Sequence, residues 1–199
     1  MKDFWEEKYN QDEYIFGTEP DTYLADKLPN FAPGKILFPG EGEGRNAVYA
    51  AKLGWQVTAF DYSSSAKIKA EKLANINDVN IEYLTLDITE QNFPSESFDV
   101  IAYLFIHFEG EKRKAVHNAI NAQLKVGGIL ILECFSDQHP IQEGKGPRSS
   151  NFLYSKANMQ EDFPNYEIVE LKIDEELLKE GPSDMGESSI LRFIGKKTS

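Results

Sequence analysis

Short apolar runs alternate with longer amphipathic segments along most of the chain. Apolar runs bounded by turn residues predict strands, and segments with apolar positions three or four apart predict helices. In the helix over 66–75 the pattern indicates Ile68 and Leu73 as the apolar anchors. The strands are expected at 36–38, 56–60, 81–86, 97–104, 129–135, 166–174 and 188–196, and the main helices at 21–28, 45–53, 66–75, 111–124 and 156–163.

The stretch from Lys35 to Asp61, KILFPGEGEGRNAVYAAKLGWQVTAFD, contains the most informative local pattern. It is expected to form strand, glycine loop, helix and second strand, the first βαβ unit of a doubly wound sheet. Ligands of such folds bind at the carboxyl ends of the strands. Asp61, which closes the second strand, suits a ribose, because ribose hydroxyls donate hydrogen bonds to a carboxylate.

The glycine loop indicates which nucleotide is bound. Its spacing is G-x-G-x-G, whereas a dinucleotide site has G-x-G-x-x-G with a bare helix N-terminus facing pyrophosphate. The intervening residues, Glu41 and Glu43, would repel a phosphate and tolerate a cation. S-adenosylmethionine has a ribose, a sulfonium and no phosphate, so this pattern favours it over NAD. A structural turn with two solvated glutamates is the alternative.

The run GEGEGRNAV followed by FDYS resembles the class I S-adenosylmethionine-dependent methyltransferases. Within them it is similar to the tellurite-resistance and thiopurine-methyltransferase-like branch, from FWEEKY at the N-terminus to the final strand. The resemblance implies a Rossmann-like, doubly wound, seven-stranded α/β sheet, mostly parallel, with an antiparallel C-terminal hairpin strand. Many relatives have Asp two positions before the first glycine. This chain has Phe38 there, so a contact from that acid cannot be transferred.

The resemblance also implies the residues of the cofactor site. Asp87 would accept from the adenine amino group while Ile88 packs on the ring, although an Asp at the end of a strand is also a common turn former. Tyr103 and Phe105 lie at the cofactor end of the strand over 97–104. The predicted cofactor-binding residues are Tyr9, Phe16, Gly40, Glu41, Gly42, Gly44, Asn46, Asp61, Tyr62, Ser63, Asp87, Ile88, Tyr103 and Phe105.

Residues 1–30 are expected to form an N-terminal helical arm that is rich in aromatic side chains. Trp5 and Tyr9, four positions apart, would share one face of a short helix. The arm could pack on the edge of the sheet, or cover the cofactor as a lid, because aromatic faces attract a sulfonium. Both interpretations stay open at this point.

Three features after the fourth strand are candidates for work on the methyl acceptor. His107 could be a general base or an orienting group, or a packed residue between aromatics. The loop over 136–155 contains His139, Lys145 and Arg148, which could recognise a substrate anion, or the loop could be a mobile surface segment. Glu133 lies inside a buried run and needs partners.

Composition limits the partners. Subtracting 33 Asp and Glu from 21 Lys and Arg gives a net charge of −12, which disfavours nucleic acid and anionic membranes. The single cysteine, Cys134, excludes an intrachain disulfide and a cysteine-rich metal site, and no metal is expected. With no apolar run of membrane-spanning length and no signal-peptide pattern, we expect one cytoplasmic domain over 1–199, monomeric or homodimeric.

The function expected from these observations is methyl transfer from S-adenosylmethionine to a small-molecule acceptor, such as a thiol, a chalcogen oxyanion or another metabolite. A sulfonium already activates the methyl carbon, so no covalent nucleophile is needed, and His107 is the candidate catalytic residue. Two alternatives remain, a non-catalytic S-adenosylmethionine-binding module and a nucleotide-dependent dehydrogenase.

Overall fold

The computed structural model describes residues 2–141, 146–147, 149–180 and 183–199. Its strands form one seven-stranded sheet in the order β3-β2-β1-β4-β5-β7-β6. The pairs β1–β2, β2–β3 and β4–β5 are parallel, and β5–β7 is antiparallel. The predicted Rossmann-like sheet, mostly parallel with an antiparallel C-terminal hairpin, is therefore confirmed.

The chain divides into two compact units. The first contains residues 2–92, with Glu180 and Ser183 assigned to it, and the second contains residues 93–179 and 184–199. The single domain expected over 1–199 stays a prediction.

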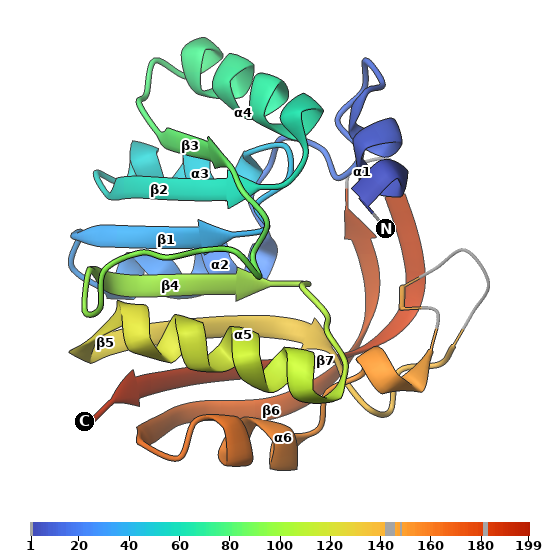
Figure 1. Ribbon diagram of the computed structural model, residues 1–199. Helices are drawn as coiled ribbons and strands as arrows, with labels where there is room; N and C mark the ends of the chain where they lie inside the picture. Colours follow the sequence, from blue (N-terminus) through green and yellow to red (C-terminus); the bar gives the residue numbers. More distant parts are fainter. Residues whose placement is uncertain (1, 142–145, 148, 181–182) are drawn as a thin grey trace. The chain divides into compact units, whose positions relative to one another are not determined.

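The first unit contains the predicted βαβ pattern (Figure 1). Its parallel strands are β1 (Lys35–Pro39), β2 (Gln56–Asp61) and β3 (Glu82–Thr85). β2 pairs with both others, and the exposed–buried pattern of β1 and β2 matches strands that are buried on both faces. Its helices are α1 (Lys2–Tyr9), α2 (Thr22–Lys27), α3 (Arg45–Lys52) and α4 (Ser64–Ile76), with a 3-10 turn, η1, at Leu28–Asn30.

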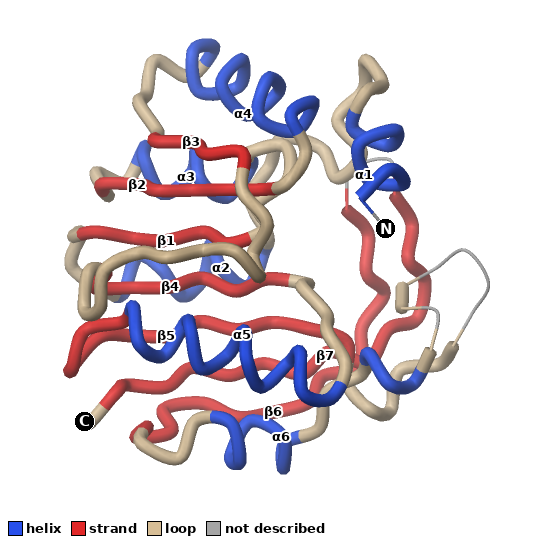
Figure 2. Tube along the Cα trace, in the orientation of Figure 1, coloured by secondary structure: helices blue, strands red, loops and turns tan. Residues whose placement is uncertain are grey.

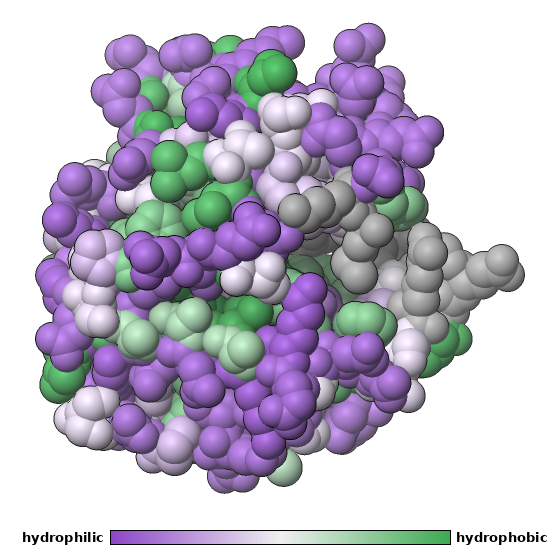
Figure 3. Space-filling model, in the orientation of Figure 1, coloured by the Kyte–Doolittle hydropathy of each residue, from purple (hydrophilic) through white to green (hydrophobic). Residues whose placement is uncertain are grey.

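One side-chain prediction for α4 is wrong. Ile68 is 66% exposed, whereas Leu73 is buried together with Ala66, Lys69, Ala70 and Ala74. Those buried positions are three or four apart and form one helical stripe, from which Ile68 is displaced. Figure 3 shows that the outward surface over α4 is mainly hydrophilic, and Ile68 is an exposed exception to it. The small alanines of the stripe let α4 approach the glycine loop.

The second unit contains β4 (Phe98–Leu104), β5 (Leu124–Phe135), β6 (Tyr166–Glu180) and β7 (Ser183–Lys197). Helices α5 (Gly110–Gln123) and α6 (Lys156–Asp162) lie on the same face of these strands (Figure 2). A short 3-10 turn, η2, covers Ser150–Phe152. Ser155 caps α6 through a capping box with Asn158.

The strands of the second unit begin earlier or end later than predicted. β5 starts at Leu124, before its predicted start at residue 129, and its pairing with β4 has a register shift between Phe98 and Val100. β6 continues past its predicted end at residue 174 to Glu180, and β7 starts at Ser183, before its predicted start at residue 188. β6 and β7 are longer than the stretches of alternating apolar residues in them, because main-chain hydrogen bonds between strands do not require apolar side chains.

The buried Glu133 has the partner that its burial required. Arg192, on the adjacent strand β7, donates from Nε to Glu133 Oε1 at 2.8 Å and also pairs with Asp174 and Glu176. A second buried cluster joins α5 to α6, where Asp162 accepts from Arg113 and His117 at 2.7 Å each. Both carboxylates are thereby paired inside the core and serve the fold. Across the described residues, no helix has the length and apolar character needed to cross a membrane.

Candidate functional site

The glycine loop between β1 and α3 is the centre of the candidate site in the first unit. Gly40, Gly42 and Gly44 have φ values of +56°, +66° and +90°, a region that favours glycine. At Gly44 a Cβ would lie 2.6 Å from the Cβ of Ala70, so this glycine also lets α3 begin directly against α4. The glycines of the loop therefore permit both the left-handed backbone of the turn and the close packing of α3 on α4.

Glu41 closes the N-terminus of α3. Its Oε1 accepts hydrogen bonds from the backbone N–H groups of Asn46 and Ala47, at 2.9 and 2.8 Å. Burial raises the pKa of Glu41 to about 7, against the lowering effect of these hydrogen bonds and of Arg45. A helix N-terminus with its N–H groups free would suit a phosphate. In this chain a carboxylate already holds those groups.

Glu43 has a different partner. Its carboxylate is 2.7 Å from the Lys69 ammonium and also accepts from the Ile15 N–H at 2.7 Å. Lys69 additionally donates to the Glu13 carbonyl oxygen at 2.7 Å. Both loop carboxylates therefore have partners within the first unit. The predicted cofactor contact of Glu41 stays a prediction. Phosphate remains disfavoured, because Glu41 occupies the N-terminus of the helix.

Asp61 is placed as predicted, at the carboxyl end of β2 beside the glycine loop. Its Oδ2 accepts from the Gly42 N–H at 3.2 Å and its Oδ1 accepts from the Ser63 N–H at 3.0 Å. Burial raises the pKa of Asp61 to about 6. Each carboxylate oxygen can accept more than one hydrogen bond, so this arrangement still fits ribose hydroxyls.

Neighbours of Asp61 complete this edge of the first unit. Ser63 is fully buried and caps α4 through the Ala66 N–H, and Tyr62 is half-buried. Asp87 accepts from the backbone and hydroxyl of Thr89, and Ile88 is buried. The hydrogen bond from the Thr89 N–H to Asp87 forms the turn that a structural role predicts. The adenine role of Asp87 stays a prediction.

The Asn46 side chain points into the interior of the first unit. It is buried, and its Oδ1 accepts from the Asp21 N–H at 2.8 Å, while Asp21 caps α2. The Asn46 side chain therefore holds the N-terminal arm at the start of α2. Its predicted contact with a cofactor is not tested by this geometry.

The N-terminal arm lies on the glycine loop within the first unit. Tyr9 is 6% exposed, and a Cβ added at Gly42 would lie 2.8 Å from its phenolic oxygen. Trp5 stacks on Tyr9 with ring centroids 5.4 Å apart and contacts Phe16 at 6.1 Å. The expected helix with Trp5 and Tyr9 on one face is confirmed, and its aromatic side packs inward.

The predicted residues Tyr103, Phe105 and His107 belong to the second unit. Tyr103 is fully buried and contacts His117 edge-on. Phe105 has φ +53°, which is strained for an aromatic residue, and its ring lies 5.3 Å from that of Phe135. His107 Nδ1 is 2.8 Å from the Phe152 carbonyl oxygen, and burial lowers the pKa of His107 to about 4.

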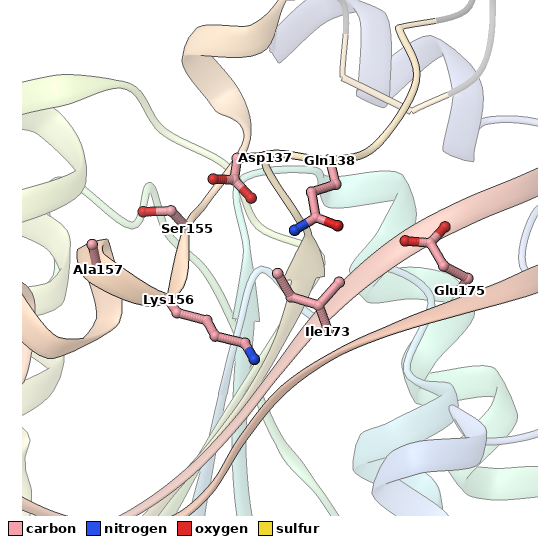
Figure 4. A pocket seen from close by; sticks show the side chains of 7 residues that line it. All are labelled: Asp137, Gln138, Ser155, Lys156, Ala157, Ile173 and Glu175. Atoms are coloured by element: carbon pink, nitrogen blue, oxygen red, sulfur yellow. The ribbon is translucent and has the colours of Figure 1, made fainter.

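Asp137, Gln138 and Ser155, from the range 136–155, line part of an open pocket of the second unit. Figure 4 shows this pocket, with a volume of about 560 Å³. Lys145 and Arg148, predicted to recognise an anion, lie outside the described residues. Among the residues that are described, no group of three His, Cys, Asp or Glu could hold a metal ion. The pocket is lined by Asp137, Gln138, Ser155, Lys156, Ala157, Ile173 and Glu175.

Three residues that organise the site were not found from the sequence. Lys69 neutralises Glu43 within the loop, and Tyr83 donates from its hydroxyl to the Gly42 carbonyl oxygen. Glu6 accepts from Ser64 and Ser65 at the start of α4, and so attaches α1 to that helix. The only sequence signal was a Lys on an otherwise apolar stripe of α4, which implied a buried anion as its partner.

Comparison with known proteins gives consistent results. The family model described as "Methyltransferase domain" matches residues 37–132. A curated relative from Haemophilus influenzae, the probable S-adenosyl-L-methionine-dependent methyltransferase TehB, is 24% identical over 173 residues, which is 85% of this chain. The chain spans 56% of that relative's length.

Solved structures share the fold. The crystal structure of Haemophilus influenzae TehB has a TM-score of 0.74 at 20% identity and covers 99% of this chain and 67% of its own. A Burkholderia thailandensis 1,6-didemethyltoxoflavin-N1-methyltransferase, crystallised with bound 1,6-didemethyltoxoflavin and S-adenosylhomocysteine, has a TM-score of 0.63 at 17% identity. This structure covers 89% of this chain and 76% of its own.

Taken with the glycine loop and Asp61, these matches support an enzyme whose cofactor is S-adenosylmethionine. The chain is thus similar to the class I S-adenosylmethionine-dependent methyltransferases, and TehB is among the relatives that it resembles.

Proposed function

We propose that this chain transfers the methyl group of S-adenosylmethionine to a small-molecule acceptor. Two carboxylates at the glycine loop, Glu41 and Asp61, carry the choice of cofactor. Glu41 occupies the N–H groups of α3 that would bind a phosphate, while Asp61 presents a carboxylate at the end of β2. A ligand with a ribose and no phosphate fits both, and NAD does not.

When bound, the cofactor supplies a methyl carbon activated by the sulfonium, so the protein's contribution is alignment and exclusion of water. Asp61 would accept from the ribose hydroxyls and orient them. Asp87 would accept from the adenine amino group and Ile88 would pack on the ring, as in related enzymes. The loop glycines would let the cofactor approach the backbone closely.

The small-molecule acceptor is supported by charge and by relatives. A net charge of −12 opposes binding to nucleic acid. The 1,6-didemethyltoxoflavin-N1-methyltransferase, which shares the fold, has a small molecule bound together with S-adenosylhomocysteine, and TehB shares the fold as well. Tellurite, thiols and other small acceptors all remain within this proposal.

The arm over 1–30 is proposed to act as a lid on the cofactor. Tyr9 already covers Gly42, so a ligand passing over the loop must share that surface or displace the ring. Aromatic faces of Tyr9 and Trp5 would then contact the sulfonium or adenine. A lid of this kind keeps water from the reacting centre.

Calorimetry with S-adenosylhomocysteine and with NAD tests the proposal. We expect binding of the first, none of the second, and a loss of about 1.5–3 kcal/mol in Asp61→Ala, the scale of a lost hydrogen bond to a charged group. The affinity lost in Asp87→Ala, measured in the same assay, gives the contribution of the proposed adenine contact. Tight NAD binding, or unchanged affinity in Asp61→Ala, would contradict the assignment.

Turnover separates the enzyme from a non-catalytic binding module. Labelled S-adenosylmethionine incubated with a panel of small thiols, chalcogen oxyanions and amines should yield a methylated product. Cofactor binding without transfer to any acceptor in such a panel would favour the binding module.

A further inference from the structure

The open pocket of the second unit is built from three segments that lie far apart in the sequence (Figure 4). Its charged and apolar lining comes from the segment after β5 (Asp137, Gln138), the start of α6 (Lys156) and β6 (Ile173, Glu175). Figure 4 shows the Ile173 side chain between Glu175 on one side and Lys156 on the other. Asp137 and Gln138 point toward Ile173 from the wall above it. The pocket thus has an apolar floor and charged walls.

The three charged side chains of the pocket do not neutralise one another. Within the described ranges, neither the Asp137 carboxylate nor the Lys156 ammonium forms an ion pair or a hydrogen bond, and the Glu175 carboxylate is bonded to a serine hydroxyl. Arg113 and Arg192, in the same unit, are both paired with carboxylates. Charges that face one hollow without partners attract a ligand of complementary charge.

Two buried serines hold one wall of the pocket in place. The Gln138 N–H donates to Ser136 Oγ at 3.1 Å. Ser136 Oγ donates in turn to Ser189 Oγ at 2.7 Å, and Ser189 Oγ donates to the Glu175 carboxylate. Both serines are fully buried. Glu175 is therefore fixed through one carboxylate oxygen, and its other oxygen can accept from a ligand. A side chain that is already ordered loses less conformational freedom on binding.

The start of α6 fixes the opposite wall. Ser155 Oγ accepts from the Asn158 N–H at 3.1 Å, and the Ser155 N–H donates to Asn158 Oδ1 at 3.0 Å. This capping box orders the backbone of Lys156, the first residue of the helix. The Ser155 hydroxyl is used by the cap, so the positive charge of this wall is the Lys156 ammonium.

We propose that this pocket binds a small zwitterion of the ω-amino acid class, in which an ammonium and a carboxylate are joined by a short apolar chain. The ammonium of the ligand lies between the carboxylates of Asp137 and Glu175, and its carboxylate pairs with Lys156. The apolar chain lies on Ile173 and Ala157. The inference goes beyond methyl transfer, because it assigns a ligand to residues of the second unit alone.

The lining requires both charges of the ligand. An amine without a carboxylate would leave Lys156 without a counter-ion and would be repelled by it. A carboxylate without an amine would meet the like charges of Asp137 and Glu175. All three charged side chains are exposed to water, which makes each contact weak. We therefore expect a Kd on the order of 1 mM for the zwitterion.

The probe is 6-aminohexanoate, with hexylamine and hexanoate as matched probes that each lack one charge. In NMR spectra of the whole isotope-labelled chain, the side-chain amide of Gln138 and the methyl group of Ala157 should shift and reach saturation with 6-aminohexanoate. Each matched probe should bind more weakly. No saturable shift at either residue in about 20 mM 6-aminohexanoate, well above the expected Kd, would overturn the proposal. Hexylamine that binds as tightly as 6-aminohexanoate would overturn the zwitterion class.

Two variants separate the ends of the ligand. Glu175→Gln can still accept from the Ser189 hydroxyl, and it should weaken 6-aminohexanoate and hexylamine about threefold without weakening hexanoate. Lys156→Met should weaken 6-aminohexanoate and hexanoate by a similar factor without weakening hexylamine. The reverse pattern, or the same loss for all three probes in either variant, would contradict the assigned ends.

Glu167→Gln and Lys179→Met are the matched controls. Both residues belong to β6, are exposed and do not line the pocket. These changes alter the net charge of the chain as Glu175→Gln and Lys156→Met do, and they should leave the affinity for 6-aminohexanoate unchanged. Control variants that weaken the probe as much as the pocket variants would show that the general charge of the chain attracts it, which would overturn the proposal.

These measurements need no cofactor and no turnover. A chain that binds 6-aminohexanoate but not S-adenosylhomocysteine would contradict the proposed methyl transfer and support the zwitterion site. A chain that binds S-adenosylhomocysteine but not 6-aminohexanoate would overturn the zwitterion site and leave the proposed methyl transfer intact.

Discussion

The phenol of Tyr9 lies directly over Gly42, so closely that a Cβ on residue 42 would be 2.8 Å from the phenolic oxygen. The backbone at Gly42 is also left-handed, with φ +66°. The N-terminal arm and the glycine loop therefore depend on each other. A larger residue at position 42 would push the Tyr9 ring, and with it the arm, away from the loop.

Gly42→Ala should destabilise the first unit by more than backbone strain alone, which costs about 1 kcal/mol. The added methyl must displace Tyr9. Tyr9→Phe removes the nearest atom, so the double variant should recover part of the loss. Urea unfolding of the four proteins measures this coupling. Gly54→Ala is the control for backbone strain alone, because Gly54 has φ +89° and its Cβ would meet nothing within 4 Å. If the destabilisations of Gly42→Ala and Tyr9→Phe simply add in the double variant, the two residues are not in contact.

Glu41 should make stability depend on pH. Its folded pKa, about 7, lies above its ordinary value of 4.5, so the native state holds the proton more tightly. The resulting stabilisation is complete below pH 4.5 and is lost as the pH rises through 7. Glu41→Gln keeps an oxygen for the Asn46 and Ala47 N–H groups and should flatten this slope. The free energy of unfolding, measured at several pH values, tests this dependence. Glu90→Gln, a change at an exposed glutamate, is the control. The same slope in Glu41→Gln and wild type would contradict the expectation.

The Glu43–Lys69 pair should be costly to break from one side. Lys69→Met leaves a buried carboxylate without its cation, which destabilises proteins by about 3–5 kcal/mol. Because Lys69 and Glu43 also hold the backbone of Glu13 and Ile15, amide exchange at Ile15 should rise in the variant. Glu43→Gln combined with Lys69→Met should recover most of the stability. No recovery in the double variant would mean that Lys69 acts through packing.

Attachment of α1 should weaken at low pH. Hydrogen bonds from Ser63 first, and from Ser65 and Ser64, lower the pKa of Glu6 to about 2, below its ordinary 4.5. The contribution of Glu6 is therefore present above pH 4.5 and is lost as the pH falls toward 2. In a Trp55→Phe background, the fluorescence of Trp5 should follow this loss. Glu6→Gln should remove the transition, and an unchanged acid transition would assign it to another group.

The sequence by itself determined the elements and the class of ligand. Alternating apolar runs and helical segments predict the sheet because burial depends on a local period, of two in strands and 3.6 in helices. Closely spaced glycines predict a tight loop because only glycine adopts left-handed backbone at low cost. Asp61 could be placed because the end of a strand is a local feature.

The tertiary structure alone decided what each charged side chain does. Glu43 meets Lys69 across 26 positions and Glu133 meets Arg192 across 59, so no local pattern could pair them. Glu41 reaches the N-terminus of its own helix, which the sequence left indistinguishable from a solvated loop residue. His107 and His139 find their hydrogen-bond partners in Phe152 and Ser189, 45 and 50 positions away. Hydrogen bonds are directional and short, and only the folded chain brings donor and acceptor within that range.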